Sequence, residues 1–288
     1  MATRRVGVAL TSIGMQSISL VGYAIVLALL GRWPVLTPEL VGYGFVLGII
    51  GVTSAAALYR ALALGPIAVV SPVVASYSAL AVVLIVIFLG ERLTFGQGAA
   101  IAATFVGVVV ASTDFGEVRK TLGRPSTLAP LATTLPSVAE QGPLPLGPLP
   151  LGVRYGLVAT FGFAVWACLY AAAVHATDGL GMILPLRVFS VLLLLVYVLV
   201  RRPSFAPLRD QRALILIVIV GVLDTGANVL LSLGIASGFA SFVMTGSGAY
   251  PLIPALLAIA VLHERLAPNQ YVGVAVLVAG LVALGLQS

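Results

Sequence analysis

The chain has 288 residues, of which 60% are hydrophobic and 8% are charged, and its mean hydropathy is +1.16. Soluble domains carry roughly 25% charged residues, so this chain cannot cover a globule with solvated side chains and is expected to be an integral membrane protein. The formal net charge of +6 comes from basic residues between apolar runs. We attribute it to membrane orientation and exclude a nucleic-acid partner. The single cysteine, Cys168, excludes an internal disulfide and fits inert packing.

Apolar runs long enough to cross a bilayer follow one another along the whole chain. About 20 apolar residues span the hydrocarbon core as a helix. By that measure the sequence predicts nine spans, at about 6–30, 40–64, 66–90, 95–112, 153–174, 180–200, 212–235, 240–262 and 268–286. None alternates with the period of a barrel strand. The predicted fold class is an all-α, polytopic helix bundle.

The one long connection, residues 113–152, contains the sequence GPLPLGPLPLG. Such a proline-rich stretch is typical of an extended, polyproline-like linker, which we favour over a docking motif for a signalling domain. It divides the chain into a first half, 1–112, with four spans, and a second half, 153–288, with five.

The two halves repeat each other. A shift of 173 positions places Gly65 on Gly238 and Tyr77 on Tyr250, and it keeps its register without a gap as far as Val109. The same shift pairs the Glu-Arg-Leu that begins at Glu91 with the one that begins at Glu264. The fourth and ninth spans are five crossings apart, an odd number, so the second repeat is expected to be inverted in the membrane. Inverted repeats are typical of transporters that work by alternating access.

The basic residues predict how the chain is oriented. With the N-terminus in the cytoplasm, 12 of the 15 Arg and Lys lie at cytoplasmic ends of spans, and Arg32, Arg92 and Arg187 lie opposite. This bias predicts a cytoplasmic N-terminus and an external C-terminus in the plasma or inner membrane.

The sequence ALYRALALGPIAVVSPVVASYSALAVVLIVIFLGERLTFGQGAAIAATFVGVVV and its second copy resemble the EamA repeat of the drug/metabolite transporter superfamily. The shared features are a tight glycine turn, a helix that ends in Gly/His-Glu-Arg-Leu and a following glycine-rich helix. The resemblance covers nearly the whole chain apart from the linker. It implies ten spans in two five-helix halves, of which this chain shows nine; the family's first helix is the one without a counterpart. It also implies solute transport and no cofactor.

Asp224 is the most informative polar residue, because it falls near the middle of the span at 212–235. An isolated charge there costs at least about 2.5–3.5 kcal/mol, so Asp224 is expected to face a cavity or a partner. Asn228 lies on the same helical face, and Thr225 and Ser232 add polarity nearby. A cation or proton site and a structural hydrogen bond to a neighbouring helix both remain open.

The spans at 66–90 and 240–262 are the candidate cavity walls, since both combine small polar residues with proline. The candidate pathway residues are Ser71, Tyr77, Ser241, Thr245 and Tyr250, and the candidate hinges are Pro72, Pro251 and Pro254. For the serines, close helix packing is the favoured alternative; for the two tyrosines the choice is even.

Other residues have two interpretations each. Trp166 and Tyr170 share a helical face and could stack on a ligand, but packing is favoured. Arg187, just inside its span, is expected to snorkel to the surface rather than to contact an anionic substrate. Trp33 is expected to be an interfacial anchor. His175 and His263 do not form a metal site.

The repeat favours a secondary transporter, with proton coupling as one option, and the family resemblance implies export of small organic solutes such as amino acids or related metabolites. The alternatives are a small-multidrug-like cation exporter, a lipid-carrier flippase and, outside transport, a membrane assembly subunit. No nucleophile and base converge, so an enzyme is the least favoured reading. Monomer and homodimer both remain open.

Overall fold

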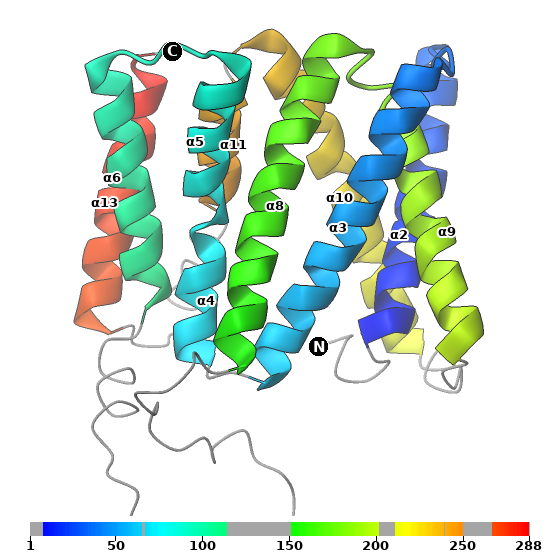
Figure 1. The fold of residues 1–288 in the computed structure, drawn as a ribbon, viewed down its shortest axis with the longest axis horizontal. Helices are drawn as coiled ribbons and strands as arrows, with labels where there is room; N and C mark the ends of the chain where they lie inside the picture. Colours follow the sequence, from blue (N-terminus) through cyan, green and yellow to red (C-terminus); the bar gives the residue numbers. More distant parts are fainter. Residues whose placement is uncertain are drawn as a thin grey trace, which may run out of the picture. The chain divides into compact units, whose positions relative to one another are not determined.

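A computed structural model describes residues 8–64, 67–113, 151–201, 211–238, 240–249 and 267–287 of the chain. In these ranges the regular elements are all helices (Figure 1): α2 (Val8–Leu30), α3 (Pro38–Leu64), α4 (Ile67–Ala75), α5 (Tyr77–Leu89), α6 (Phe95–Ser112), α8 (Leu151–Ala176), α9 (Ile183–Arg201), α10 (Gln211–Ser237), α11 (Ala240–Gly248) and α13 (Pro268–Gly285). This confirms the predicted all-helical class.

Eight stretches within the described residues are long and apolar enough to cross a membrane. They match eight of the nine predicted spans, and one of them, Pro72–Leu89, runs from α4 into α5. The predicted span at 240–262 is described only in its first part, as α11. Large apolar side chains such as Leu29 and Phe95 are 82% and 94% exposed, as expected where a surface faces lipid rather than water.

The helix bounds reproduce the shift found in the sequence. Helix α3 has 27 residues and α10 has 27, and Pro38 and Gln211, their first residues, are 173 positions apart. Helices α6 and α13 have 18 residues each and begin at Phe95 and Pro268, again 173 positions apart. The repeat therefore extends beyond Gly65 toward the N-terminus, where the residues themselves differ too much to show it.

The chain forms two compact units. Unit 1 comprises Met1–Thr53 and Val165–Val243, and unit 2 comprises Ser54–Ala164 and Met244–Ser288. Each unit draws on both sequence halves, and α3, α8 and α11 run from one unit into the other. The repeat boundaries at 112 and 153 therefore describe the sequence rather than the compact units, and they remain predictions.

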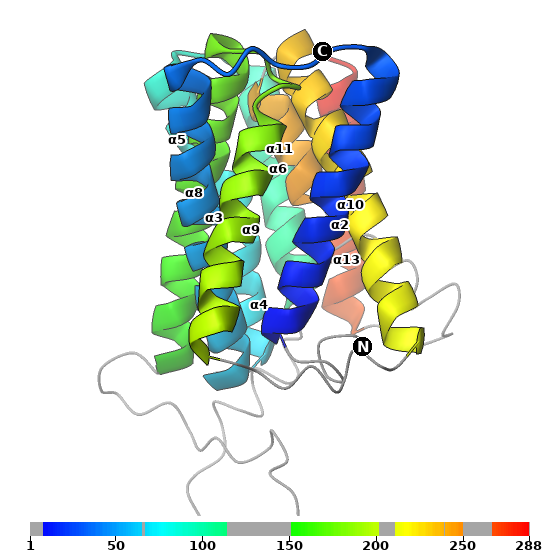
Figure 2. The same ribbon diagram turned by 90° about the vertical axis from the view of Figure 1, so that its right-hand side faces the viewer.

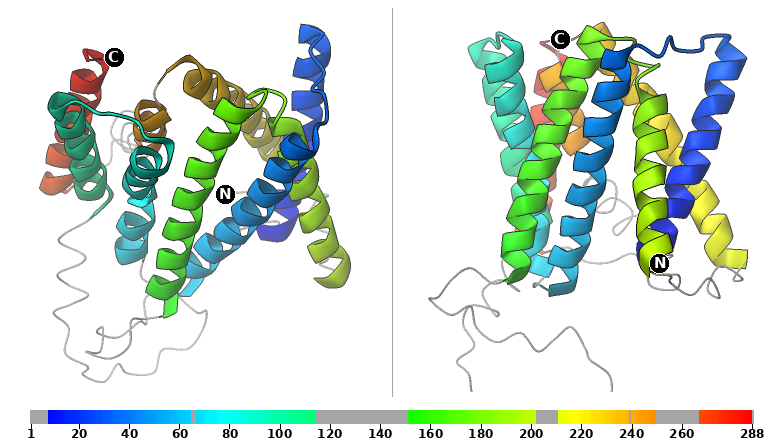
Figure 3. Two further views of the ribbon diagram at one scale, coloured as in Figure 1. Left: turned by 45° about the horizontal axis from the view of Figure 1, so that its top comes forward. Right: turned by 45° about the vertical axis from the view of Figure 1, so that its right-hand side comes forward.

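In unit 2, α6 and α13 lie side by side and run in opposite directions (Figures 1 and 3). A Cβ added to Gly107 would lie 2.3 Å from the backbone nitrogen of Leu277, and one added to Gly280 would lie 2.7 Å from that of Thr104. The shift of 173 turns the first contact into the second, so the two repeats make the same contact from opposite sides. Two equivalent helices packed antiparallel are what an inverted repeat requires.

Each of these two helices also caps the other. Gln97 Nε2 near the start of α6 donates to the Gln287 carbonyl after α13, at 3.1 Å. Asn269 Nδ2 near the start of α13 donates to the Thr113 carbonyl after α6, at 2.6 Å. Carbonyls at the end of a helix lack partners within it. Asn269 Nδ2 also reaches one of these in α6, the Val110 carbonyl, at 3.3 Å, whereas the Gln287 carbonyl lies two residues beyond the end of α13.

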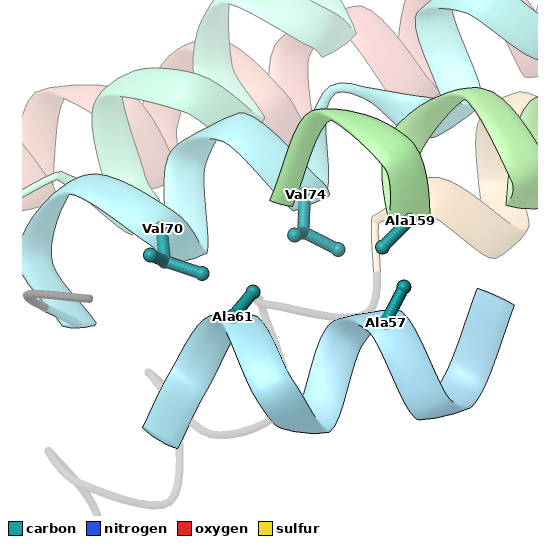
Figure 4. Close-up of a cluster of buried hydrophobic side chains, with 5 residues drawn as sticks. All are labelled: Ala57, Ala61, Val70, Val74 and Ala159. Atoms are coloured by element: carbon teal, nitrogen blue, oxygen red, sulfur yellow. The ribbon is translucent and has the colours of Figure 1, made fainter. Parts of the chain in front are cut away.

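The rest of unit 2 is held by small apolar residues. Ala57 and Ala61 of α3, Val70 and Val74 of α4, and Ala159 of α8 form one buried cluster (Figure 4). Small side chains let helix backbones approach closely where lipid removes the usual hydrophobic driving force.

The break between α4 and α5 falls at Ser76, and α11 ends in a turn at Ala249. A shift of 173 pairs these two positions, so α4 and α11 end at equivalent places in the two repeats. Pro72, a predicted hinge, lies inside α4 one turn before the break, where it removes one helical N–H donor.

In unit 1, α2 packs against both α9 and α10 (Figure 2). Gly14 faces Ile217 and Gly22 faces Thr225, so α2 and α10 run parallel. The first part of α3 lies against α9, with Gly44 at Pro185 and Gly48 at Phe189. Glycines therefore mark the closest contacts of α2 with α10 and of α3 with α9.

Candidate functional site

An ion pair lies between α9 and α10 in unit 1. Arg187 Nη2 is 2.6 Å from Asp224 Oδ2, and the two side chains are 5% and 26% exposed. A lone charge near the middle of a membrane helix is costly, and an opposite charge at this distance offsets part of that cost. Asp224 therefore has the partner that its position in the sequence demanded.

Polar side chains of α2 and α10 surround the pair. Ser19 Oγ donates to Asp224 Oδ2 at 3.0 Å, and Arg187 Nη1 donates to Gln16 Oε1. From one turn further along α10, Asn228 Nδ2 donates to Asp224 Oδ1 at 3.3 Å. We call these five residues, Gln16, Ser19, Arg187, Asp224 and Asn228, the charged cluster.

One donor of the charged cluster has no acceptor among the described residues. Arg187 Nε is buried and makes no hydrogen bond to any described residue. Leaving a buried donor unpaired costs about 1–3 kcal/mol, and more for a charged group. Such a group in a packed helix bundle calls for an explanation beyond packing.

The polar face of α10 continues beyond the cluster to Ser232, two turns after Asp224. The Tyr170 hydroxyl lies 2.6 Å from Ser232 Oγ, and Ser232 Oγ donates to the Gly179 carbonyl at 3.0 Å. Trp166 stacks on Tyr170, with ring centroids 4.8 Å apart. These contacts join α8 to the polar face of α10.

A cavity of about 560 Å³ lies at one end of unit 1, between the α2–α3 connection and the end of α8. Arg32, Glu39 and Asp178 are among its lining residues. The carbonyls that follow Asp178, those of Gly179 and Leu180, accept hydrogen bonds from Ser232 and Tyr23. One short segment, 178–180, thus contacts both the cavity and the polar face of α10.

The expectation that Arg187 snorkels to the surface is wrong. Helix α9 begins at Ile183, so Arg187 lies more than one turn inside it, and its side chain reaches Asp224 and Gln16 instead of the surface. In a low-dielectric setting, pairing with an opposite charge can be more favourable for an arginine than extending its side chain to reach water. The sequence signal that could have found this pair was the presence of two opposite charges within apolar runs.

The structure places the other predicted residues as follows. Asp224 and Asn228 lie together, and Trp166 and Tyr170 stack on each other, with Tyr170 fully buried, which fits packing. Ser241 and Thr245 are fully buried in α11, and Tyr77 lies 5.8 Å from the ring of Phe163. The side chain of Ser71 and all of Tyr250, Pro251, Pro254, Glu264 and His263 lie outside the described residues.

Sequence reasoning missed the two members of the charged cluster that belong to α2. Gln16 and Ser19 interrupt the apolar run of α2 three residues apart, but polar residues of this size occur in many membrane helices as packing elements. Within the described residues, no three His, Cys, Asp or Glu side chains gather as a metal site would require.

A sequence profile of the EamA-like transporter family matches residues 3–113 and 150–286. The chain belongs to the EamA-like transporter family. It is therefore a multi-pass membrane transporter of the drug/metabolite transporter superfamily. The two matched segments coincide with the two halves that the repeat indicates, and the unmatched stretch between them is the proline-rich linker.

A solved structure described only as "Crystal structure of protein" resembles this EamA-like transporter over 100% of its chain and 92% of the other, with a TM-score of 0.72 and 16% identity. At that identity the likeness shows a shared fold and no more. No curated protein matches the chain.

Proposed function

We propose that this EamA-like transporter is a secondary transporter that exports small organic solutes, amino acids or related metabolites, by alternating access. The observation that carries the proposal is the antiparallel packing of the equivalent helices α6 and α13. Repeats related in this way have two arrangements of similar energy, because exchanging the conformations of the two halves turns one arrangement into the other.

The end of α4 supports this mechanism. Helices α4 and α11 end at equivalent positions, Ala75 and Gly248. Pro72 lies inside α4 one turn before Ser76 and removes one helical N–H donor, so the helix can bend there.

The ion pair argues against a cation exporter. A solute with a single positive charge that bound Asp224 would take it from Arg187 and leave the buried guanidinium without a counterion. Proton coupling at Asp224 would leave Arg187 as an unpaired buried cation whenever Asp224 took up a proton. We therefore favour transport without proton uptake at Asp224. A lipid-carrier flippase and a membrane assembly subunit have no specific observation in their favour.

We further propose a plasma or inner membrane location with the N-terminus in the cytoplasm, as the distribution of 12 basic residues against 3 suggests. A reporter fused after Ser288 should then be active on the outside. Activity in the cytoplasm alone would contradict this orientation.

Flux through the purified protein in liposomes tests the transport proposal. A thermal-shift screen against amino acids, amines, nucleobases and sugars selects solutes first, since a ligand that binds the folded state stabilises it. Selected solutes should then show saturable counterflow that protein-free liposomes lack. Ligand binding without flux of any solute would favour the assembly subunit instead.

A further inference from the structure

We propose that the charged cluster is the binding site of a zwitterionic solute, one that carries an ammonium and a carboxylate on neighbouring atoms, as α-amino acids do. Asp224 would bind the ammonium and Arg187 the carboxylate. This inference rests on the proposed function and assigns the residues that bind the two charges of the solute.

Charge balance favours a zwitterion. Arg187 and Asp224 neutralise each other, so the site carries no net charge before a ligand enters. A zwitterion supplies one opposite charge for each of them and leaves the total unchanged. A solute with a single charge would leave one protein charge uncompensated in a low-dielectric setting, which is strongly unfavourable.

The two residues of the ion pair differ in their exposure and in their hydrogen bonds. The side chain of Asp224 is 26% exposed and that of Arg187 is 5% exposed, so an ammonium can approach Asp224 first. The Nε–H of Arg187 has no acceptor among the described residues, and a carboxylate oxygen is the acceptor that suits it best. Because Nε is buried, the carboxylate can reach it only when the site opens, and alternating access provides that step.

The rest of the cluster holds both charges in place. Ser19 and Asn228 donate to separate oxygens of Asp224, and Gln16 accepts from Arg187 Nη1. Asp224 therefore has a donor on each oxygen, and Arg187 is tethered at Nη1 and Nη2 while Nε stays available. Groups positioned in this way lose little entropy when a ligand arrives.

The repeat indicates that packing alone does not require these charges. A shift of 173 pairs Arg187 with Gly14 and Asp224 with Gly51, and both glycines lie in packed helices, against Ile217 and Trp166. The shared scaffold thus forms without charges at the equivalent positions of the first repeat. The pair is an addition to the second repeat, as expected for a recognition site.

Binding to the purified full-length protein tests the proposal. The probes are the neutral standard amino acids, each compared with the amine and the acid that keep its side chain: isoamylamine and isocaproate for leucine, phenethylamine and 3-phenylpropionate for phenylalanine. At least one amino acid should bind about tenfold to a hundredfold more tightly than both of its analogues, because each analogue lacks one charge-assisted contact.

The double variant Arg187→Gln/Asp224→Asn keeps the side-chain lengths and removes both charges without leaving one unpaired. It should bind an amino acid no better than the matching amine or acid, whereas Arg60→Gln, which removes an exposed arginine of unit 2, should keep the full preference. Unchanged discrimination in the double variant would overturn the proposal.

Two further outcomes separate this inference from the proposed function. Flux of an uncharged or singly charged solute, with no amino acid bound by the wild type, would overturn the zwitterion site and leave the transporter intact. Binding of amino acids with the expected preference, but no flux of any solute in liposomes, would keep the site and contradict transport.

Discussion

The α6–α13 pair and the α2–α9–α10 group are built from the same two repeats, yet they use them differently. In the first, both repeats contribute equally: Gly107 faces Leu277 as Gly280 faces Thr104. In the second, α9 and α10 carry Arg187 and Asp224 where the equivalent positions of α2 and α3 carry Gly14 and Gly51. One region keeps the symmetry of the repeat, and the other breaks it.

This difference separates what holds the transporter together from what recognises the solute. Close glycine contacts and reciprocal caps can be made twice, once per repeat, because they depend on backbone geometry that both copies share. An ion pair in a membrane helix bundle is expensive to make once. Duplicating it would serve no purpose if a single solute is bound near it.

The largest effect is expected at the asymmetric site. Asp224→Asn should lower the free energy of unfolding by about 3–5 kcal/mol, because it leaves the buried guanidinium of Arg187 without a counterion. Thermal unfolding of the purified protein measures this. The double variant Arg187→Gln/Asp224→Asn should regain most of the loss, so equal losses in the single and double variants would refute the coupling of the two charges.

The symmetric pair should respond to both glycines alike. Gly107→Ala and Gly280→Ala should each cost about 1–3 kcal/mol, since a new Cβ would meet backbone atoms of the opposite helix at 2.3 and 2.7 Å. Gly98, also in α6, has nothing within 4 Å of such a Cβ. Gly98→Ala should therefore stabilise the protein by about 0.5–1 kcal/mol, and a loss there equal to that at Gly107 would argue against close packing as the cause.

The reciprocal caps should give the smallest effect. Asn269→Ala and Gln97→Ala each remove a donor to a backbone carbonyl just after the end of the opposite helix, and each should cost about 1 kcal/mol. The exposed hydroxyl of Ser237 bonds only within its own helix, so Ser237→Ala serves as the control in the same unfolding measurement. A cost at one cap and none at the other would break the symmetry of the pair.

Much of the fold could be predicted from residue types alone. Eight spans fall where the apolar runs are, because the bilayer fixes the length of a helix that crosses it. The inversion followed from counting crossings between two copies of Glu-Arg-Leu. The depth of Asp224 within its span also marks it as a candidate functional residue, and a spacing of four residues places Asn228 on the same helical face.

The partners of Asp224 were decided only by the tertiary structure. Sequence spacing shows which residues share a face of one helix, and it contains no information about which faces of α2, α9 and α10 meet. From the sequence, Arg187 is expected to reach the surface because it lies just inside its predicted span, after Pro185. Gly14 and Gly22 bring α2 close to α10, and Ser19 and Arg187 from two different helices both contact the carboxylate of Asp224. The bilayer sets the length and apolar composition of each helix separately, whereas the ion pair forms only where two helices pack together.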